Sequence, residues 1–340
     1  MSKSKIYVYC PAEKVTGGAE LLHQIVDVLN NHGYDAYVVY FNGLNCRVPD
    51  DYKKYNIKLS SSIEDTAENI VILFEGYFFP LSFIKNAKIV LWWLSVDNFY
   101  RCQCSRVSLN DLKDYSIRMF CKEFVKKILG KREDYICSLK ALSQDNRVVL
   151  NAFQSEYAKD FLIKQKFSNL YPLKDYINDE YVYDRTLMQR KENIVIYNPK
   201  KGWIFTRKLI ASSPDIKWVP IQNMNRTQVK ETMQKAKVYV DFGFHPGKDR
   251  IPREAAMCGC CVITGKQGSA GFYGDVPINE KEYKFNQKNK DIPKILEKIH
   301  YLLDNYDFSI DDFAHYRECI AKEKSEFVQD ALNIAEKLCE

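Results

Sequence analysis

The strongest constraint on this chain is an alternation of short apolar segments with amphipathic helical segments. In the first half, KIYVYC at 5–10 and AYVVYF at 36–41 are typical of β-strands, and apolar residues recur with helical spacing between them. A strand–helix–strand unit predicts parallel pairing, because the chain must return across the sheet before the next strand begins. Three more apolar segments extend the predicted sheet: 69–75, 88–96 and 148–153.

The same alternation restarts in the second half of the chain. The stretch 168–193 has Pro172 and many polar and aromatic residues without a clean period, so we predict a linker there. After it, four strand-like segments alternate with helical ones: 193–198, 216–221, 237–243 and 260–264. The residues from Asp311 to Leu338 are predicted to be helical. We therefore expect an α/β protein with two Rossmann-like, doubly wound domains, 1–182 and 183–315, that face each other across a ligand cleft.

The composition of the 340 residues is that of a globular protein, with 46% hydrophobic and 28% charged residues. The longest apolar run, Ile89–Leu94, is far shorter than the ~20 residues that span a bilayer. The N-terminal MSKSKIYVYCPAEK has neither the apolar core nor the cleavage site of a signal peptide. With 11 cysteines and no export signal, we expect reduced thiols and a cytoplasmic location. A net charge of +6 suits an anionic ligand or a membrane surface, and it is too weak to indicate a nucleic-acid partner.

Two loops that follow predicted strands have the composition of phosphate-binding turns. VTGGAE places Gly17 and Gly18 before a helix, where backbone N–H groups favour an anion; a plain tight turn explains the two glycines equally well. YNPKKG places Lys200 and Lys201 ahead of another helix, and lysines supply point charges for a diphosphate. The alternative for this second loop is a surface turn with two solvated lysines.

The richest segment is DFGFHPGKDRIPREAAMCGCCVIT at 241–264, where a strand ends in a loop and a short helix starts at Pro252. The loop contains four residues that suit an anion beside a helix N-terminus: Gly247, Lys248, Asp249 and Arg250. Glu254 lies in the first turn of the helix, and a carboxylate there can accept hydrogen bonds from two vicinal ribose hydroxyls. The alternative for Glu254 is a charge that caps the helix.

These segments resemble the GT-B glycosyltransferases, and more narrowly the group 1 family of retaining nucleotide-sugar transferases. The helix and strand EAAMCGCCVI is similar to the end of that family's Glu-x7-Glu motif, and KKG is similar to its EKG-type turn. The resemblance implies that Glu254 binds the donor ribose and that Lys201 binds the donor diphosphate. It also implies a GT-B fold, a glycine-rich loop near the donor at 267–274, and a C-terminal helix at 316–340 that packs back toward the first domain.

The chain departs from that family at two positions. Pro246 stands where the family has the glutamate that contacts the donor sugar, so His245, Lys248 or Asp249 would have to take that role. Asn198 stands near the position of the family's arginine. Two alternatives therefore stay open: a sugar-nucleotide epimerase of the same fold, and a non-catalytic pseudo-transferase subunit that binds a nucleotide or a partner.

The sequence offers little to hold a metal ion. It has no Asp-x-Asp, the paired carboxylates that hold a divalent ion against a diphosphate in metal-dependent transferases of the other major fold. Five cysteines fall in two short groups, and neither group has a second pair at zinc-site spacing, so we expect them to be buried thiols: Cys102 and Cys104, and Cys258, Cys260 and Cys261. We therefore expect no metal and no other cofactor.

The first domain contains two candidate bases and a basic helix. Asp97 and Glu75 end predicted strands, where a carboxylate could deprotonate an acceptor hydroxyl if the reaction inverts the anomeric centre; for Asp97, an Asp-Asn turn is the alternative. The predicted helix 112–129 and the turn after it carry these cations: Lys113, Arg118, Lys122, Lys126, Lys127, Lys131 and Arg132. Opposite them we expect these apolar residues: Leu112, Met119, Phe120, Phe124 and Ile128. The helix could rest on anionic lipid, or it could pack on the core with a solvated basic face.

Together these features predict a glycosyltransferase of the hexosyltransferase type in surface polysaccharide or glycoconjugate biosynthesis. It would move a sugar from a nucleotide-diphosphate sugar to a saccharide or lipid-linked acceptor, with retention of configuration and without a metal. The predicted catalytic residues are Lys201, Lys248, Arg250 and Asp97. The predicted donor-binding residues are Gly17, Gly18, Asn198, Lys200, Lys201, His245, Gly247, Lys248, Asp249, Arg250 and Glu254. We expect the enzyme to act in the cytoplasm, either free or in contact with the inner face of the membrane.

Overall fold

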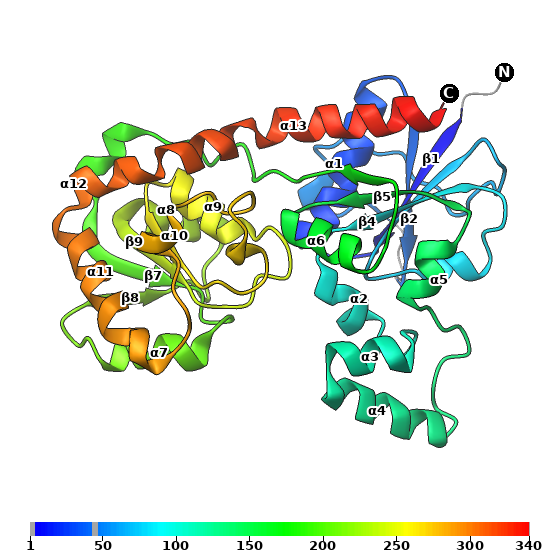
Figure 1. Cartoon of the computed structure of the whole chain (residues 1–340). Coiled ribbons are helices and arrows are strands. Elements are labelled where there is room, and N and C mark those ends of the chain that lie inside the picture. The colour runs from blue at the N-terminus through cyan, green and yellow to red at the C-terminus, as the bar shows by residue number, and fades with distance from the viewer. Residues whose placement is uncertain (1–3, 43–46, 340) are drawn as a thin grey trace. The chain divides into compact units, whose positions relative to one another are not determined.

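The computed structural model describes residues 4–42 and 47–339, and the chain divides into two compact units (Figure 1). Unit 1 contains the described residues up to Asp175 together with those from Glu326 onward. Unit 2 comprises Tyr176–Ser325. Each unit has its own sheet and its own apolar core, so each is described by itself.

Unit 1 is built on a six-stranded parallel sheet with the strand order β2-β1-β3-β4-β5-β6. Its strands are β1 (Lys5–Pro11), β2 (Asp35–Phe41), β3 (Ile70–Phe74), β4 (Lys88–Trp93), β5 (Val148–Phe153) and β6 (Leu170–Pro172). The central strands are almost entirely apolar because helices or loops cover both faces of a parallel sheet. Trp92 and Trp93, at the end of β4, are completely buried, one on each face.

The helices of unit 1 before its last segment are α1 (Gly17–Asn31), α2 (Val96–Cys102), α3 (Leu109–Tyr115), α4 (Ile117–Ile128), α5 (Leu139–Gln144) and α6 (Glu156–Lys164). The prediction of one continuous helix over 112–129 is wrong. The backbone is extended at Ser116, with φ −160°, and α3 ends there. The Ser116 hydroxyl then accepts a hydrogen bond from the Met119 N–H, so the residue that breaks the helix also caps the next one.

Unit 2 is built on a four-stranded parallel sheet with the order β10-β9-β7-β8. Its strands are β7 (Glu192–Tyr197), β8 (Lys217–Pro220), β9 (Ala236–Asp241) and β10 (Cys261–Thr264). Its helices are α7 (Trp203–Ala211), α8 (Arg226–Lys235), α9 (Arg250–Met257), α10 (Glu280–Tyr283), α11 (Ile292–Asp304) and α12 (Tyr306–Ser309). The segment 168–193, predicted to be an irregular linker, contains β6 and a 3-10 helix at Arg185–Arg190.

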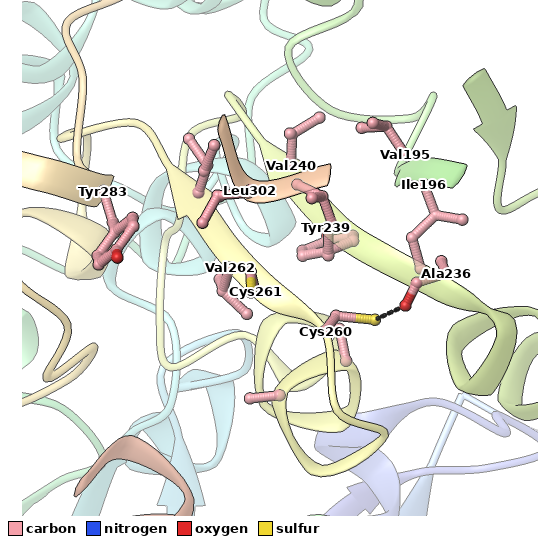
Figure 2. Packing of buried hydrophobic residues seen from close by; sticks show 14 of the residues in the cluster. Val195, Ile196, Ala236, Tyr239, Val240, Cys260, Cys261, Val262, Tyr283 and Leu302 are labelled. Carbon is pink, nitrogen blue, oxygen red and sulfur yellow. Dashed lines mark hydrogen bonds between the residues drawn. The ribbon is translucent and has the colours of Figure 1, made fainter. Parts of the chain in front are cut away.

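The core of unit 2 shows how the cysteines are used. Figure 2 shows Cys260 and Cys261 among buried aliphatic and aromatic side chains, and the Cys260 thiol donates to the Ala236 carbonyl at 3.4 Å. Cys258 is buried as well, so the prediction of buried thiols is confirmed for these three residues. It is wrong for Cys102, which is exposed at the end of α2, and Cys104 is half-buried. The described cysteines are all free thiols.

The C-terminal helix α13 (Ala314–Cys339) contributes to both units. A 3-10 turn at Ile310–Phe313 precedes it, so the long helix starts three residues later than the predicted Asp311. Its last part belongs to unit 1, where Phe327 stacks on Trp92 with ring centroids 6.3 Å apart. Among the described residues, no helix combines the length and the apolar character needed to cross a bilayer.

The two sheets share one topology. In unit 1 the order β2-β1-β3-β4 matches β8-β7-β9-β10 in unit 2, so β1 and β7 are equivalent strands. The chain direction across the sheet reverses beside each of these strands. In open parallel sheets, ligands bind beyond the carboxyl ends of the strands at such a reversal. The loops after β1, β7 and β9 are therefore the positions to examine for a site.

Candidate functional site

The loop between β7 and α7 is a tight turn that carries two lysines. The Asn198 side chain accepts a hydrogen bond from the Lys200 N–H at 3.0 Å, and the Asn198 carbonyl accepts one from the Lys201 N–H at 3.3 Å. Gly202 has φ +60°, and a Cβ there would lie 2.5 Å from the backbone carbon of Phe242. Only glycine fits this position, so the lysine loop is held directly against the segment that follows β9.

A charged cluster lies where this loop meets the end of β9. His245 is completely buried, with Nε2 3.3 Å from Asp241 Oδ1 and Nδ1 3.0 Å from Asp249 Oδ2. Lys201 forms an ion pair with the same Asp249 oxygen. Asp241 is fixed in turn by the Tyr239 hydroxyl, which donates at 2.7 Å. Two cations and two carboxylates thus alternate from Asp241 to Lys201.

Burial and charge act in opposite directions on His245. Burial lowers the pKa of the imidazole, but the Asp241 and Asp249 carboxylates outweigh it and raise that pKa to about 9. For Asp241, burial raises the pKa of the carboxyl, and the imidazolium and the hydrogen bonds to Asp241 bring it below its ordinary value. His245 therefore carries a positive charge at neutral pH, and the cluster as a whole is neutral.

A glycine-rich loop closes over this cluster. The His245 carbonyl accepts a hydrogen bond from the Ser269 N–H at 2.8 Å, and the Ser269 hydroxyl donates to the Gly247 carbonyl at 2.6 Å. Gly268 has φ +64°, and a Cβ there would lie 1.9 Å from the His245 carbonyl oxygen. The segment 267–274 thus lies against the loop after β9.

Lys248 is held by partners that the sequence analysis did not single out. The Arg253 guanidinium is completely buried and lies 2.6 Å from Glu323 Oε2, while Lys248 Nζ lies 2.6 Å from Glu323 Oε1. Arg253 also donates to the Lys248 carbonyl at 2.8 Å. Arg253 is one of three charged residues of α9, with Arg250 and Glu254, and nothing in the sequence marked it as the buried one. Glu323 carried no signal either, since it comes from α13, 70 residues away.

Helix α9 begins at Arg250, and Pro252 is its third residue rather than its first. Proline is tolerated there because the first turn of a helix has no internal partner for its N–H groups. Asp249 occupies the capping position, but its carboxylate makes no capping hydrogen bond and faces Lys201 and His245 instead. The positive end of the α9 dipole therefore adds to the cations at this edge of the sheet.

Glu254 is half-buried on α9. Burial raises the pKa of its carboxyl, and the charges of Arg250 and Arg253 oppose that shift. A hollow of about 270 Å³ adjoins the lysine loop at the carboxyl ends of β7 and β8. Its lining combines aliphatic and amide side chains: Pro199, Lys200, Ile221, Gln222, Asn223, Met224 and Val229. Such a lining suits a flat heterocycle with polar edges.

Among residues 4–42 and 47–339, one group of side chains is close enough to share a metal ion, and it is the same cluster. One ligand atom from each of Asp241, His245 and Asp249 lies within 4.8 Å of the others. Each carboxylate already has other partners, Lys201 for Asp249 and Tyr239 for Asp241. A cation at this position would have to displace the Lys201 ammonium.

The predicted residues of the first half lie in unit 1. Gly17 and Gly18 open α1, and the Thr16 hydroxyl caps that helix by accepting from the Ala19 N–H at 3.3 Å. Asp97 is buried on α2 and accepts a hydrogen bond from the Tyr115 hydroxyl. Burial raises the pKa of the Asp97 carboxyl, and the Tyr115 hydrogen bond acts against that shift.

Glu75 is completely buried and fixes the backbone before α2. Its carboxylate accepts from the Leu94 N–H at 2.8 Å and from the Ser95 N–H at 3.0 Å, and also from the Asn98 amide at 3.2 Å. Burial raises the pKa of this carboxyl to about 7, although these hydrogen bonds favour the ionised form. Glu75 therefore has a structural role in joining β3 to the β4–α2 loop.

Comparison with known proteins bears on the fold. No protein-family model matches the sequence, and no curated protein matches it in sequence. Sucrose-phosphate synthase from Thermosynechococcus elongatus is similar in structure over 99% of both chains, with a TM-score of 0.65 and 12% identity. A glycosyltransferase from Rickettsia africae is similar over 100% of both chains, with a TM-score of 0.60 and 13% identity. The lipopolysaccharide outer core galactosyltransferase WaaB is similar over 98% of both chains, with a TM-score of 0.53 and 10% identity.

These likenesses, together with the two parallel sheets, establish that the chain has the GT-B glycosyltransferase fold. The fold class predicted from the sequence is confirmed. The predicted site residues fall into two groups: Gly17, Gly18, Asp97 and the candidate base Glu75 lie in unit 1, and all the others lie in unit 2.

Proposed function

We propose that this protein is a glycosyltransferase that binds a nucleotide-diphosphate sugar in unit 2 and transfers its hexose to a hydroxyl of a saccharide or lipid-linked acceptor. The observation that carries the proposal is the arrangement of Lys201 and His245 at the carboxyl ends of β7 and β9. Lys201 there adjoins the N-termini of α7 and α9, where no side chain caps the first turn, and the buried His245 can balance Asp249 when Lys201 turns to a ligand. A diphosphate is the ligand with the charge and size for that position.

Lys201 can exchange its present partner for the diphosphate. Its side chain and that of Asp249 are both partly exposed, with 28% and 22% of their surfaces accessible. When the anion binds, Lys201 would turn toward the phosphate oxygens, and Asp249 would keep His245 as its partner. Charge on the diphosphate grows as the glycosidic bond breaks, so Lys201 would stabilise the transition state more than the bound substrate.

The nucleoside would lie beside the diphosphate. The hollow lined by Ile221, Met224 and Val229 would hold the base, and Glu254 would accept hydrogen bonds from the ribose hydroxyls. Removing that charge in Glu254→Gln should weaken binding of the nucleotide by roughly 1–3 kcal/mol, the scale of a lost charge-assisted hydrogen bond. Calorimetric titration with UDP and with GDP measures the effect. Unchanged affinity would remove Glu254 from the proposed ribose site.

We propose further that transfer occurs with retention of configuration. The bond from the anomeric carbon to the diphosphate oxygen breaks, the acceptor oxygen bonds to the same face of that carbon, and the acceptor proton passes to the departing diphosphate. No side-chain base is then required, in keeping with the burial of Glu75 and with the Asp97–Tyr115 hydrogen bond. NMR of the product gives its anomeric configuration. An inverted product, together with loss of activity in Asp97→Asn, would overturn this mechanism.

The reaction is also proposed to proceed without a metal, because the Lys201 ammonium already pairs with the Asp249 carboxylate that a metal ion would need as a ligand. Full activity in EDTA is expected, and a strict divalent requirement would instead point to Asp241, His245 and Asp249 as ligands. By analogy with structural neighbours such as WaaB, we propose a role in surface polysaccharide or glycoconjugate assembly at the cytoplasmic side of the membrane.

The decisive experiment combines binding and transfer. A thermal-shift screen with UDP, GDP and dTDP identifies the base, because a ligand that binds only the folded chain raises the melting temperature. The matching nucleotide sugars are then assayed with acceptor panels. Transfer or slow hydrolysis of one sugar supports the proposal. Release of nucleotide with epimerisation of the sugar, or binding without turnover, would refute it.

A further inference from the structure

Helix α4 (Ile117–Ile128) exposes its apolar side. Ile117, Phe124 and Ile128 have 62%, 44% and 70% of their surfaces accessible, and Cys121 between them is exposed as well. Positions 117, 121, 124 and 128 follow helical spacing, so these side chains form one stripe along the helix. Val125 and Leu129 have 54% and 59% of their surfaces accessible and lie beside the stripe.

The inward side of α4 is packed against the protein and is mixed in character, because Met119 and Phe120 pack on the apolar core of unit 1 beside the polar Glu123. Glu123 is buried, forms an ion pair with Lys126 at 2.7 Å, and accepts from the Cys104 thiol at 3.6 Å.

A surface helix of a globular protein normally buries its apolar stripe and exposes its charges. In α4 only part of the apolar surface is buried in this way, and a second apolar stripe is exposed together with the cations. The alternative of a core-packed helix with a solvated basic face holds in part: Leu112, Met119 and Phe120 pack on the core of unit 1, whereas Phe124 and Ile128 face outward.

Cations border the exposed stripe on both sides. At helical spacing, Arg118 and Lys122 lie along one border and Lys127 along the other, and all three are exposed. The segment 117–131 contains one acidic residue, Glu123, and that residue is buried. The outward face of α4 thus combines apolar side chains with positive charge and no exposed carboxylate of its own.

The helix stands apart from the sheet. It belongs to the insertion between β4 and β5, and Figure 1 shows α3 and α4 as a small helical extension of unit 1, away from its strands. The Ser116 cap and the buried Glu123 hold α4 in this orientation. The apolar stripe is therefore a fixed surface of the folded unit.

We propose that α4 docks unit 1 on the surface of an anionic phospholipid bilayer. The helix would lie in the plane of the interface, with Ile117, Phe124 and Ile128 at the boundary of headgroups and acyl chains. Arg118, Lys122 and Lys127 would contact the lipid phosphates, to which basic residues near a membrane are attracted. The proposal concerns a surface of unit 1 and does not depend on transferase activity.

A second copy of the chain fits this face less well. Two-fold pairing would bring the same patch of both copies together, and the cations that border one stripe would then face those of the other. Like charges placed across an interface oppose association. A lipid surface supplies the negative charge that this arrangement lacks.

Co-sedimentation of the full chain with vesicles tests the proposal. The chain should bind vesicles of phosphatidylcholine with phosphatidylglycerol, bind pure phosphatidylcholine weakly, and be released by added salt. The triple variant Ile117→Ser, Phe124→Ser, Ile128→Ser should bind anionic vesicles more than about tenfold more weakly, because the apolar contact is lost. The double variant Arg118→Glu, Lys122→Glu should also lose binding. A matched control is Ile163→Ser on α6, where 56% of the side chain is exposed.

Folding and activity are measured in the same variants. Circular dichroism and donor binding should be unchanged, since the altered residues are exposed and lie outside unit 2. Failure of the wild-type chain to bind anionic vesicles, or equal binding by the triple serine variant, would overturn the proposal whether or not the enzyme is active. A concentration-dependent dimer that the triple variant abolishes, without vesicle binding, would assign this face to a second copy and equally overturn it.

Discussion

The loops that follow β1 and β7 occupy equivalent positions in two sheets of the same topology, yet their chemistry differs. In unit 1, the Thr16 hydroxyl caps α1, and Glu20 places a carboxylate in the first turn. In unit 2, Gly202 occupies the capping position of α7 without a side chain, and no acidic residue lies in the first turn. The positive end of the α1 dipole is thus compensated by Thr16 and Glu20 of the same helix start. At α7, Lys200 and Lys201 add positive charge to the positive end of the dipole.

This difference shows that the topology places backbone N–H groups where an anion can bind, but that it does not by itself make an anion site. A strand–loop–helix unit directs backbone N–H groups toward the carboxyl edge of any such sheet. Whether an external anion gains from them depends on the side chains that already satisfy the helix start. Glu20, for example, is buried and accepts a hydrogen bond from the Tyr55 hydroxyl at 3.0 Å, so the first turn of α1 has an internal anion.

The largest expected effect is on turnover, which should depend on the loop after β7 and not on the loop after β1. Lys201→Ala should lower kcat by about 10²–10³-fold, the loss seen when one preorganised charge-stabilising group is removed, with a smaller change in KM. Lys14→Ala, which removes an exposed lysine two residues before the Thr16 cap of α1, should leave kcat unchanged. Steady-state kinetics with the identified nucleotide sugar measures both. Equal effects of the two substitutions would contradict the assignment of the donor to unit 2.

The units should also lose stability in different pH ranges. The pKa of Glu75 is raised to about 7. Its contribution to the stability of the folded chain is therefore complete below the ordinary pKa of 4.5 and is lost as pH rises through 7. The pKa of His245 is raised from 6.5 to about 9. Its contribution to the stability of the folded chain is therefore complete below pH 6.5 and is lost as pH rises through 9. Urea unfolding at a series of pH values should show that the free energy of unfolding falls by at most about 3 kcal/mol as Glu75 ionises, and Glu75→Gln should remove this fall. A variant with the wild-type pH profile would exclude Glu75 as its cause.

Glycine substitutions compare the backbones of the two loops. Gly202→Ala forces a left-handed φ on alanine and brings its Cβ within 2.5 Å of Phe242, so it should destabilise the chain by about 1–3 kcal/mol. Gly18→Ala meets no atom within 4 Å and should be neutral or stabilising by up to about 1 kcal/mol. Thermal unfolding of both variants gives the comparison. Similar melting temperatures would mean that the close approach at Gly202 relaxes without penalty.

The smallest effect concerns the cap of α1. Thr16→Ala removes the hydroxyl that accepts from the Ala19 N–H and should reduce the free energy of unfolding by about 1 kcal/mol. Nucleotide affinity should stay unchanged, because this helix start belongs to unit 1. Denaturant unfolding and calorimetry are the measurements. Weaker nucleotide binding in this variant would instead connect α1 to the donor.

The sequence by itself determined the order of the strands other than β6 and the location of the loops that follow them, but it did not show β6, the break between α3 and α4, or α11. Apolar segments such as 5–10 and 193–198 are strands because their residues suit a sheet covered on both faces, and that pattern is local. The lysine loop and the segment after β9 could be singled out because strand ends mark the edge where ligands bind. The two glycines before α1 looked equally suitable, since the cap by Thr16 is a matter of geometry that composition does not reveal.

Only the tertiary structure decided the partners of the charged residues and the direction of α4. Lys201 and Asp249 are 48 residues apart, and Arg253 and Glu323 are 70 apart, so no local spacing predicts that they meet. Periodicity gave α4 an apolar and a basic side, but it did not say which side the protein would cover. That depends on the packing of Met119 and Phe120 on the core and on the contacts of the buried Glu123 with Lys126 and Cys104, which exist only once the chain between β4 and β5 has folded.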